Sequence, residues 1–202
     1  MNQLATVRSL QQRISTMQPA RLADGLPTPQ SLKPLLPGGA VRKGAAISVQ
    51  GSLHLALSFM HEISQSGAWC GVIGVPNLSV EAAAQTGLNL ERLVLVPTPG
   101  KHLIGVAGML SEVLTALVLA PATAPAPGEI ERLNARLRDH GTALVILGNW
   151  PRSDTSLQVI DSRWSGLESG FGMLRTHELS VRSTDRRGGR THTVRFCDGR
   201  LT

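Results

Sequence analysis

Short apolar runs alternate with amphipathic segments through the middle of the chain, from about residue 44 to residue 150. The runs are rich in Val, Ile, Leu and Ala and lack the strict polar alternation of a half-exposed strand. Such runs are typical of strands buried on both faces of a mostly parallel sheet, with helices covering it. They predict strands at 45–50, 69–75, 93–96, 115–120 and 142–148.

The amphipathic segments between these strands predict helices. Gly67, Gly87 and Gly141 follow three of the segments and are typical helix-terminating residues, because glycine adopts the left-handed conformation at low cost. The predicted helices cover residues 52–66, 79–86, 102–113 and 129–139.

The beginning of the chain has a different pattern. Apolar residues recur there at three- and four-residue steps, which predicts an amphipathic helix over roughly residues 2–17. Prolines and glycines then interrupt regular structure. We therefore divide the chain into residues 1–40, a helix with a Pro-rich linker, and residues 41–202, the core with a basic C-terminal hairpin. The helix would dock on the core, on another copy or on a partner through Leu4, Val7, Leu10 and Ile14.

After Trp150 the pattern changes again. Short segments with alternating polar positions predict antiparallel strands at the edge of the sheet. The stretch DRRGGR, residues 185–190, predicts a hairpin tip, because Gly-Gly readily supplies positive φ angles.

Composition favours a globular, cytoplasmic protein. The chain is 42% hydrophobic and 17% charged, and no apolar run approaches the ~20 residues that a membrane helix needs. Cys70 and Cys197 are the only cysteines, which is consistent with two reduced thiols. No pair of histidines has the spacing of a zinc site, so we expect no metal.

The net charge of +6 lies at the two ends of the chain, whereas the middle is slightly acidic. Five C-terminal arginines form a basic patch candidate, and no aromatic residue is interleaved to stack on bases. DNA phosphate contact, an acidic partner and a merely solvated hairpin all remain open. The candidates are Arg182, Arg186, Arg187, Arg190 and Arg195.

An ordered set of segments resembles the RecA-type ATPases. LLPGGAVRKGAAISVQG resembles the turn and strand before the phosphate-binding loop, and VEAAAQTGLNLERLVLVPTP resembles the later helix, turn and third strand. TALVLA falls where the Walker B strand stands. The resemblance covers about residues 36–150 and implies an α/β fold, a truncated RecA-like core with a mostly parallel sheet flanked by helices.

The resemblance also shows which chemistry is missing. Gly51 falls on the last glycine of the phosphate loop, which puts Ser52 at the lysine position and Leu53 at the Mg²⁺-binding hydroxyl position. The second strand leads to Pro76 where an acid would position water, and the Walker B strand ends at Ala120 where an aspartate would stand. Since positioning and electrostatics supply nearly all of phosphoryl-transfer catalysis, we expect no catalytic residue, no cofactor and no enzyme activity.

Among RecA relatives, the chain looks like the short actinobacterial ImuA-type (ImuA prime) family, on the block AAAQTGLNLERLVLVP, the segment GNWPRSD and the basic ending. That resemblance implies an adaptor of damage-induced translesion synthesis, which contacts an ImuB-type Y-family-like protein and, indirectly, an error-prone DNA polymerase alpha subunit. Trp150, Arg152 and Trp164 are candidate partner contacts, unless the tryptophans pack under the sheet edge. The alternative is a SulA-like cell-division inhibitor.

Overall fold

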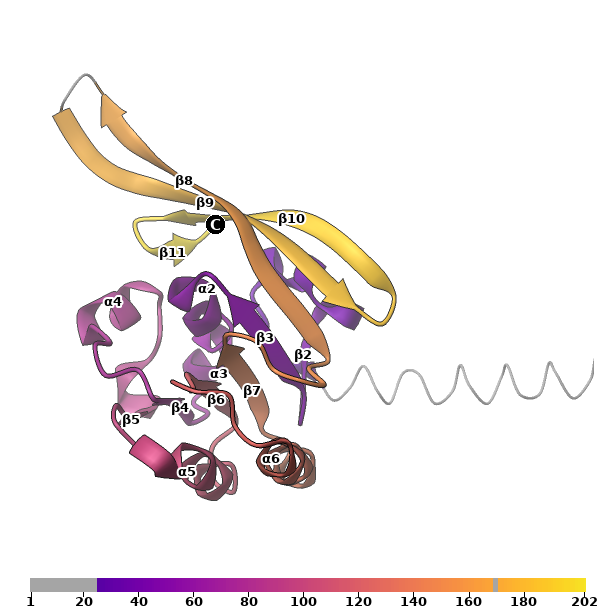
Figure 1. Ribbon diagram of the computed structural model, residues 1–202. Coiled ribbons are helices and arrows are strands. Elements are labelled where there is room, and N and C mark those ends of the chain that lie inside the picture. The colour runs from indigo at the N-terminus through magenta and orange to yellow at the C-terminus, as the bar shows by residue number, and fades with distance from the viewer. Residues whose placement is uncertain (1–24, 169–170) are drawn as a thin grey trace, which may run out of the picture.

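The computed structural model describes residues 25–168 and 171–202. Their strands form a nine-stranded sheet in the order β11-β10-β9-β8-β3-β7-β6-β4-β5, and a separate pair of short strands, β1 (Gly25–Leu26) and β2 (Val41–Arg42). Figure 1 shows helices packed around the parallel half of the large sheet and a long ribbon projecting from the other half. The predicted α/β fold is confirmed. The predicted helix over residues 2–17, with Leu4, Val7, Leu10 and Ile14, lies outside the described residues.

The five strands expected from apolar runs are all present and parallel to their neighbours. Most of their residues are buried, as continuous apolar strands in a covered sheet should be. The strands are β3 (Ala46–Gln50), β4 (Cys70–Ile73), β5 (Leu93–Val96), β6 (Ala116–Leu119) and β7 (Ala143–Leu147).

The helices are α2 (Leu53–Ser58), α3 (His61–Gln65), α4 (Val80–Gln85), α5 (Leu103–Leu110) and α6 (Pro127–His140). They cover both faces of the parallel strands (Figure 1). Helices α2 to α4 pack over one core cluster, and α5 and α6 pack over the other. Successive residues of β3 alternate between the two, since Ile47 and Val49 belong to the first cluster and Ala46 to the second.

The prediction of a single helix over residues 52–66 is wrong, because the structure has two helices there, α2 and α3. The Ser58 hydroxyl donates to the His54 carbonyl at 2.8 Å, a local bond that bends helices. The Met60 N–H then donates to the Leu57 carbonyl at 2.9 Å, a tighter turn than the α-helical step. Phe59 and Met60 are both buried at this break.

Strand β8 (Thr155–Glu168) is antiparallel to β9 but lies parallel to β3, so it is not the purely antiparallel edge strand that the sequence predicts. The short segment before it therefore runs from the carboxyl end of β3 back to its amino end. Gly148 N–H donates to the Val49 carbonyl at one end, and Asp154 N–H donates to the Ala46 carbonyl at the other.

The remaining strands are antiparallel, as expected: β9 (Phe171–Asp185), β10 (Gly188–Cys197) and β11 (Arg200–Leu201). The segment before β2 contains the 3-10 helices η1 (Gln30–Leu35) and η2 (Pro37–Gly39). The Ser183 hydroxyl of β9 donates to the Leu35 carbonyl at 2.7 Å, which ties this segment to the sheet. No helix within the described residues is long and apolar enough to cross a membrane.

Candidate functional site

The turn between β3 and α2 occupies the position of a RecA-type phosphate loop. Gly51 has φ +92°, and a methyl group there would lie 3.1 Å from Cβ of Val159 in β8. The Ser52 hydroxyl accepts a hydrogen bond from the Leu55 N–H at 3.0 Å and so caps α2. Leu53 is half-buried against the first core cluster. These residues build a tight strand-to-helix junction packed against β8.

The two other nucleotide-site positions follow β4 and β6. The backbone there is tied together, since Gly74 N–H donates to the Val96 carbonyl and Ala120 N–H donates to the Ile73 carbonyl, both at 2.9 Å. Pro76 lies exposed just beyond the end of β4. Within residues 25–168 and 171–202 there is no cluster of three His, Cys, Asp or Glu side chains that could hold a metal. The absence of ATP hydrolysis and of tight ATP binding stays a prediction.

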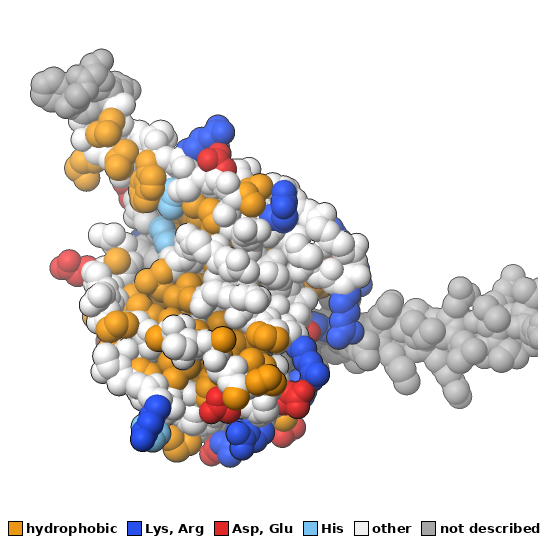
Figure 2. All heavy atoms as spheres, viewed as in Figure 1, with side chains coloured by type: hydrophobic (Ala, Val, Ile, Leu, Met, Phe, Trp, Pro, Cys, Tyr) orange, Lys and Arg blue, Asp and Glu red, His pale blue; other side chains and the backbone are white. Residues whose placement is uncertain are grey.

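The outer part of the β8–β9 ribbon, here called the arm, exposes apolar side chains. Figure 2 shows them as orange spheres on the projection from the body. Their exposed fractions run from 45% to 68%, and the pairing of β8 with β9 is irregular at two places along the arm. The arm residues are Ile160, Trp164, Leu167, Met173 and Leu174.

A cluster of rings lies where the arm leaves the body. Trp164 stacks on His177 with ring centroids 3.9 Å apart, and His54 packs on Phe196 at 4.0 Å. His54 Nε2 lies 2.8 Å from the Gly199 carbonyl, which fixes the ring. Burial lowers the pKa of His54, opposed by that hydrogen bond, and burial together with the charge of His54 lowers the pKa of His177. Sequence analysis missed this cluster, because its members come from α2, β8, β9 and β10.

The three partner candidates after β7 have different environments. Trp150 is 2% exposed and its indole N–H donates to Asn134 Oδ1 at 3.3 Å, so it belongs to the core and not to a partner surface, which corrects that expectation. Arg152 is exposed and pairs with Glu131 at 2.6 Å. Trp164 stays available, since it is 52% exposed on the arm.

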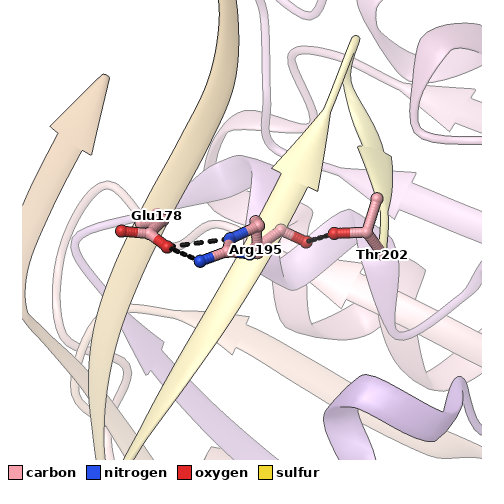
Figure 3. A network of polar contacts seen from close by, with 3 residues as sticks. All are labelled: Glu178, Arg195 and Thr202. Atoms are coloured by element: carbon pink, nitrogen blue, oxygen red, sulfur yellow. Dashed lines mark hydrogen bonds and ion pairs between the residues drawn. The ribbon is translucent and has the colours of Figure 1, made fainter. Parts of the chain in front are cut away.

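The five basic candidates on β9 and β10 do not form one patch. Arg195 is paired with Glu178 on the neighbouring strand, with its Nε 2.8 Å from the carboxylate, and Thr202 donates to the Arg195 carbonyl (Figure 3). Arg182 and Arg190 are exposed along the strands. The remaining two, at the β9–β10 turn, line a cavity of about 930 Å³ with basic residues from other parts of the chain.

Comparisons with known proteins find a matching family and a related protein. Residues 34–152 match the family described as the MT3502 N-terminal domain. The uncharacterized protein Rv3395c of Mycobacterium tuberculosis (strain ATCC 25618 / H37Rv) is 29% identical over 137 residues, which are 67% of this chain and 61% of that protein. The chain thus spans about three fifths of the length of this relative.

A solved structure supports the fold. The crystal structure of the RadB recombinase superposes with a TM-score of 0.58 at 17% sequence identity, covering 85% of this chain and 96% of that one. This likeness confirms the predicted RecA-like fold. Since the family match covers residues 34–152, more than half of the 202 residues, the chain belongs to the MT3502 N-terminal domain family.

Proposed function

We propose that this chain is a non-catalytic RecA-like adaptor of DNA-damage-induced translesion synthesis, which acts by protein contact. The observation that carries the proposal is the arm, a projecting ribbon with apolar side chains in solvent. The turn at the phosphate-loop position supports the non-catalytic part of the proposal. Gly51 there forms the tight junction between β3 and α2, and the Ser52 side chain caps α2.

The arm has the properties of a docking element. Met173 and Leu174 are 68% and 51% exposed, whereas the same ribbon buries Leu179 and Val181 where it crosses the body. Large exposed apolar groups that lie close together mark interaction surfaces more often than isolated ones do. Tryptophan and methionine are also enriched in interface cores. A partner with an apolar groove would bury the arm.

The proposed partner is the ImuB-type Y-family-like protein, through which an error-prone DNA polymerase alpha subunit is reached indirectly. The resemblance to ImuA-type proteins of the block AAAQTGLNLERLVLVP, the segment GNWPRSD and the basic ending supports this choice. The family match ends at Arg152, immediately before β8, so the arm lies outside the segment that defines the family. The core would then supply a scaffold, and the arm would supply the contact.

The test is a binding titration of the purified full chain with the ImuB-type protein. Met173→Ser combined with Leu174→Ser should weaken binding about 30-fold or more, because the loss of even one buried interface anchor costs ~2 kcal/mol or more. Met109→Ser with Val113→Ser is the matched control, since both side chains are exposed on or beside α5. Equal binding by both variants would contradict the proposal.

A pull-down from cells treated with a DNA-damaging agent tests the identity of the partner. Recovery of the ImuB-type protein, lost with the arm variant, is the expected result. Recovery of the tubulin-like division protein in its place would favour the SulA-like alternative.

A further inference from the structure

A basic groove lies at the amino end of the parallel strands, at the opposite end of β3 from the phosphate-loop position. Its volume is about 930 Å³, and its walls come from the β2–β3 turn, the last turns of α6, the segment before β8 and the β9–β10 turn. Figure 2 shows Lys and Arg side chains along the side of the body where β9 and β10 turn. Its basic residues are Arg42, Lys43, Arg138, Arg152, Arg186 and Arg187.

Three carboxylates also line the groove, and each has a partner there. Asp154 accepts hydrogen bonds from Arg42 and from the Ala46 N–H, both at 3.0 Å. Glu131 pairs with Arg152 at 2.6 Å, and Asp185 accepts from the backbone N–H at the β9–β10 turn at 2.6 Å. These contacts hold the walls in place and pair Asp154 and Glu131 with arginines, whereas Asp185 keeps its charge. The six basic and three acidic lining residues give a net charge of +3.

Positive charge is therefore left over. Within residues 25–168 and 171–202, the guanidinium groups of Arg138, Arg186 and Arg187 take part in no ion pair, although all three line the same groove. They come from α6 and from the β9–β10 turn, two parts of the chain separated by about fifty residues of sequence. Arginines without carboxylate partners around one concavity form a site for an anion with several charges.

The backbone is shaped to build this wall. Arg152 has φ +62°, the left-handed region that a non-glycine residue adopts at a cost of about 1–2 kcal/mol. Gly44 has φ +69°, and a methyl group there would lie 2.8 Å from the Arg138 Cα, so only glycine lets the β2–β3 turn approach the end of α6 so closely. Both features bring basic side chains from separate segments to the groove.

The lining also decides the class of ligand. Pro37, Ala45 and Ala46 are its only apolar members among the described residues, and both alanines are buried. A protein partner would find little apolar surface to cover. None of the described residues that line the groove has an aromatic ring on which a base could stack. A ligand with regularly repeated phosphate groups, which arginines can bind regardless of the base sequence, fits this lining best.

We propose that the basic groove binds the phosphodiester backbone of nucleic acid. The site goes beyond the adaptor function and does not depend on the arm. It would hold the strand at the amino end of the sheet and leave the bases free, so binding would be independent of sequence and sensitive to salt.

The test is fluorescence anisotropy of a labelled single-stranded oligothymidylate with the purified full chain over a range of salt concentrations. Each lost phosphate contact changes the slope of log K against log salt by about 0.7. Arg186→Ala with Arg187→Ala should therefore reduce the slope by about 1.4 and the affinity roughly 25-fold at ~0.1 M salt. Arg138→Ala, on a different element, should reduce the affinity about fivefold under the same conditions.

The matched control removes two arginines from the arm. Arg163→Ala with Arg175→Ala changes the net charge equally, and both side chains are exposed away from the groove. This control and the Met173→Ser, Leu174→Ser variant should bind the oligonucleotide like the unmodified chain, so failure of the groove and failure of the arm are distinguishable.

Three results would overturn the proposal. The first is no salt-dependent binding by the unmodified chain, and the second is an equal loss in the groove and control variants. The third is oligonucleotide binding that stays unchanged while the Arg186, Arg187 variant loses affinity for an acidic peptide such as polyglutamate, which would assign the groove to a protein partner.

Discussion

Trp150 allows the sharpest test of the core beneath α6. Its side chain is 2% exposed, packs in one cluster with Leu133 and Ile146, and donates a hydrogen bond to Asn134 Oδ1. Trp150→Ala would cost about 3–5 kcal/mol of unfolding free energy. That is a large part of the ~5–15 kcal/mol that stabilises a typical domain, so a smaller change is more informative.

Trp150→Phe keeps most of the apolar volume and removes the indole N–H. Asn134, 8% exposed, is then left with a buried carbonyl oxygen that has lost its donor. The unsatisfied oxygen costs about 1–3 kcal/mol, and the smaller ring costs about 1 kcal/mol more. We expect Trp150→Phe to lower the free energy of unfolding by about 2–4 kcal/mol. Adding Asn134→Leu should recover part of it, because both hydrogen-bonding groups are then gone.

Urea denaturation followed by far-ultraviolet circular dichroism measures both effects, since removing a tryptophan would alter a fluorescence signal. A loss of about 3 kcal/mol shifts the midpoint by ~1 M urea for a chain of this size. Trp69→Phe is the control, because Trp69 is 42% exposed and contacts Arg92 through its ring face. Its effect should stay within about 1 kcal/mol. A Trp150→Phe effect no larger than the control, or no recovery with Asn134→Leu, would refute the reasoning.

Two further predictions concern titratable groups. The pKa values of His54 and His177 are lowered from the ordinary 6.5. Below about pH 6.5 these histidines therefore bind protons more readily in the unfolded chain than in the folded one. The free energy of unfolding should fall as the pH drops from about 6.5 toward the lowered pKa values. Urea midpoints from about pH 7.5 to about pH 5.5 should show this loss, and His54→Gln should reduce it; an unchanged pH dependence would contradict the assignment. Burial raises the pKa of the Cys70 thiol to about 12, whereas Cys197 is half-exposed, so a thiol reagent should label Cys197 in the folded protein and Cys70 only on unfolding. Rapid labelling of Cys70 in native conditions would show that β4 is not buried.

The parallel half of the fold could be predicted from sequence, because buried strands leave continuous apolar runs. The run at 115–120 contains β6, and the run at 142–148 contains β7. The break between α2 and α3 could not be predicted, because the Ser58 hydroxyl competes for a backbone carbonyl within an otherwise helical pattern. The position of β8 beside β3 was also missed, since strand pairing depends on the whole topology.

Some candidate site residues could be identified from the sequence, and others could not. Trp164 could be singled out as a residue type enriched in interfaces, and because it is exposed on the arm, its partner contact stays a prediction. Trp150 has the same chemistry and lies in the core, and sequence alone does not separate the two. The groove could not be found, because Arg42, Arg138 and Arg186 line one concavity only when β2, α6 and the β9–β10 turn are in place.

The parallel pairing of β8 with β3 has a consequence for synthesis on the ribosome. Within the part of the chain that the structure describes, β3 pairs only with β7 and β8, so Ala46 meets its partner Leu144 only after about a hundred further residues have been made. At ~5–20 residues per second, both edges of this strand are open for ~5–20 s. An unpaired apolar strand is a template for other chains. The nascent chain, more than the finished protein, is therefore the form most exposed to aggregation.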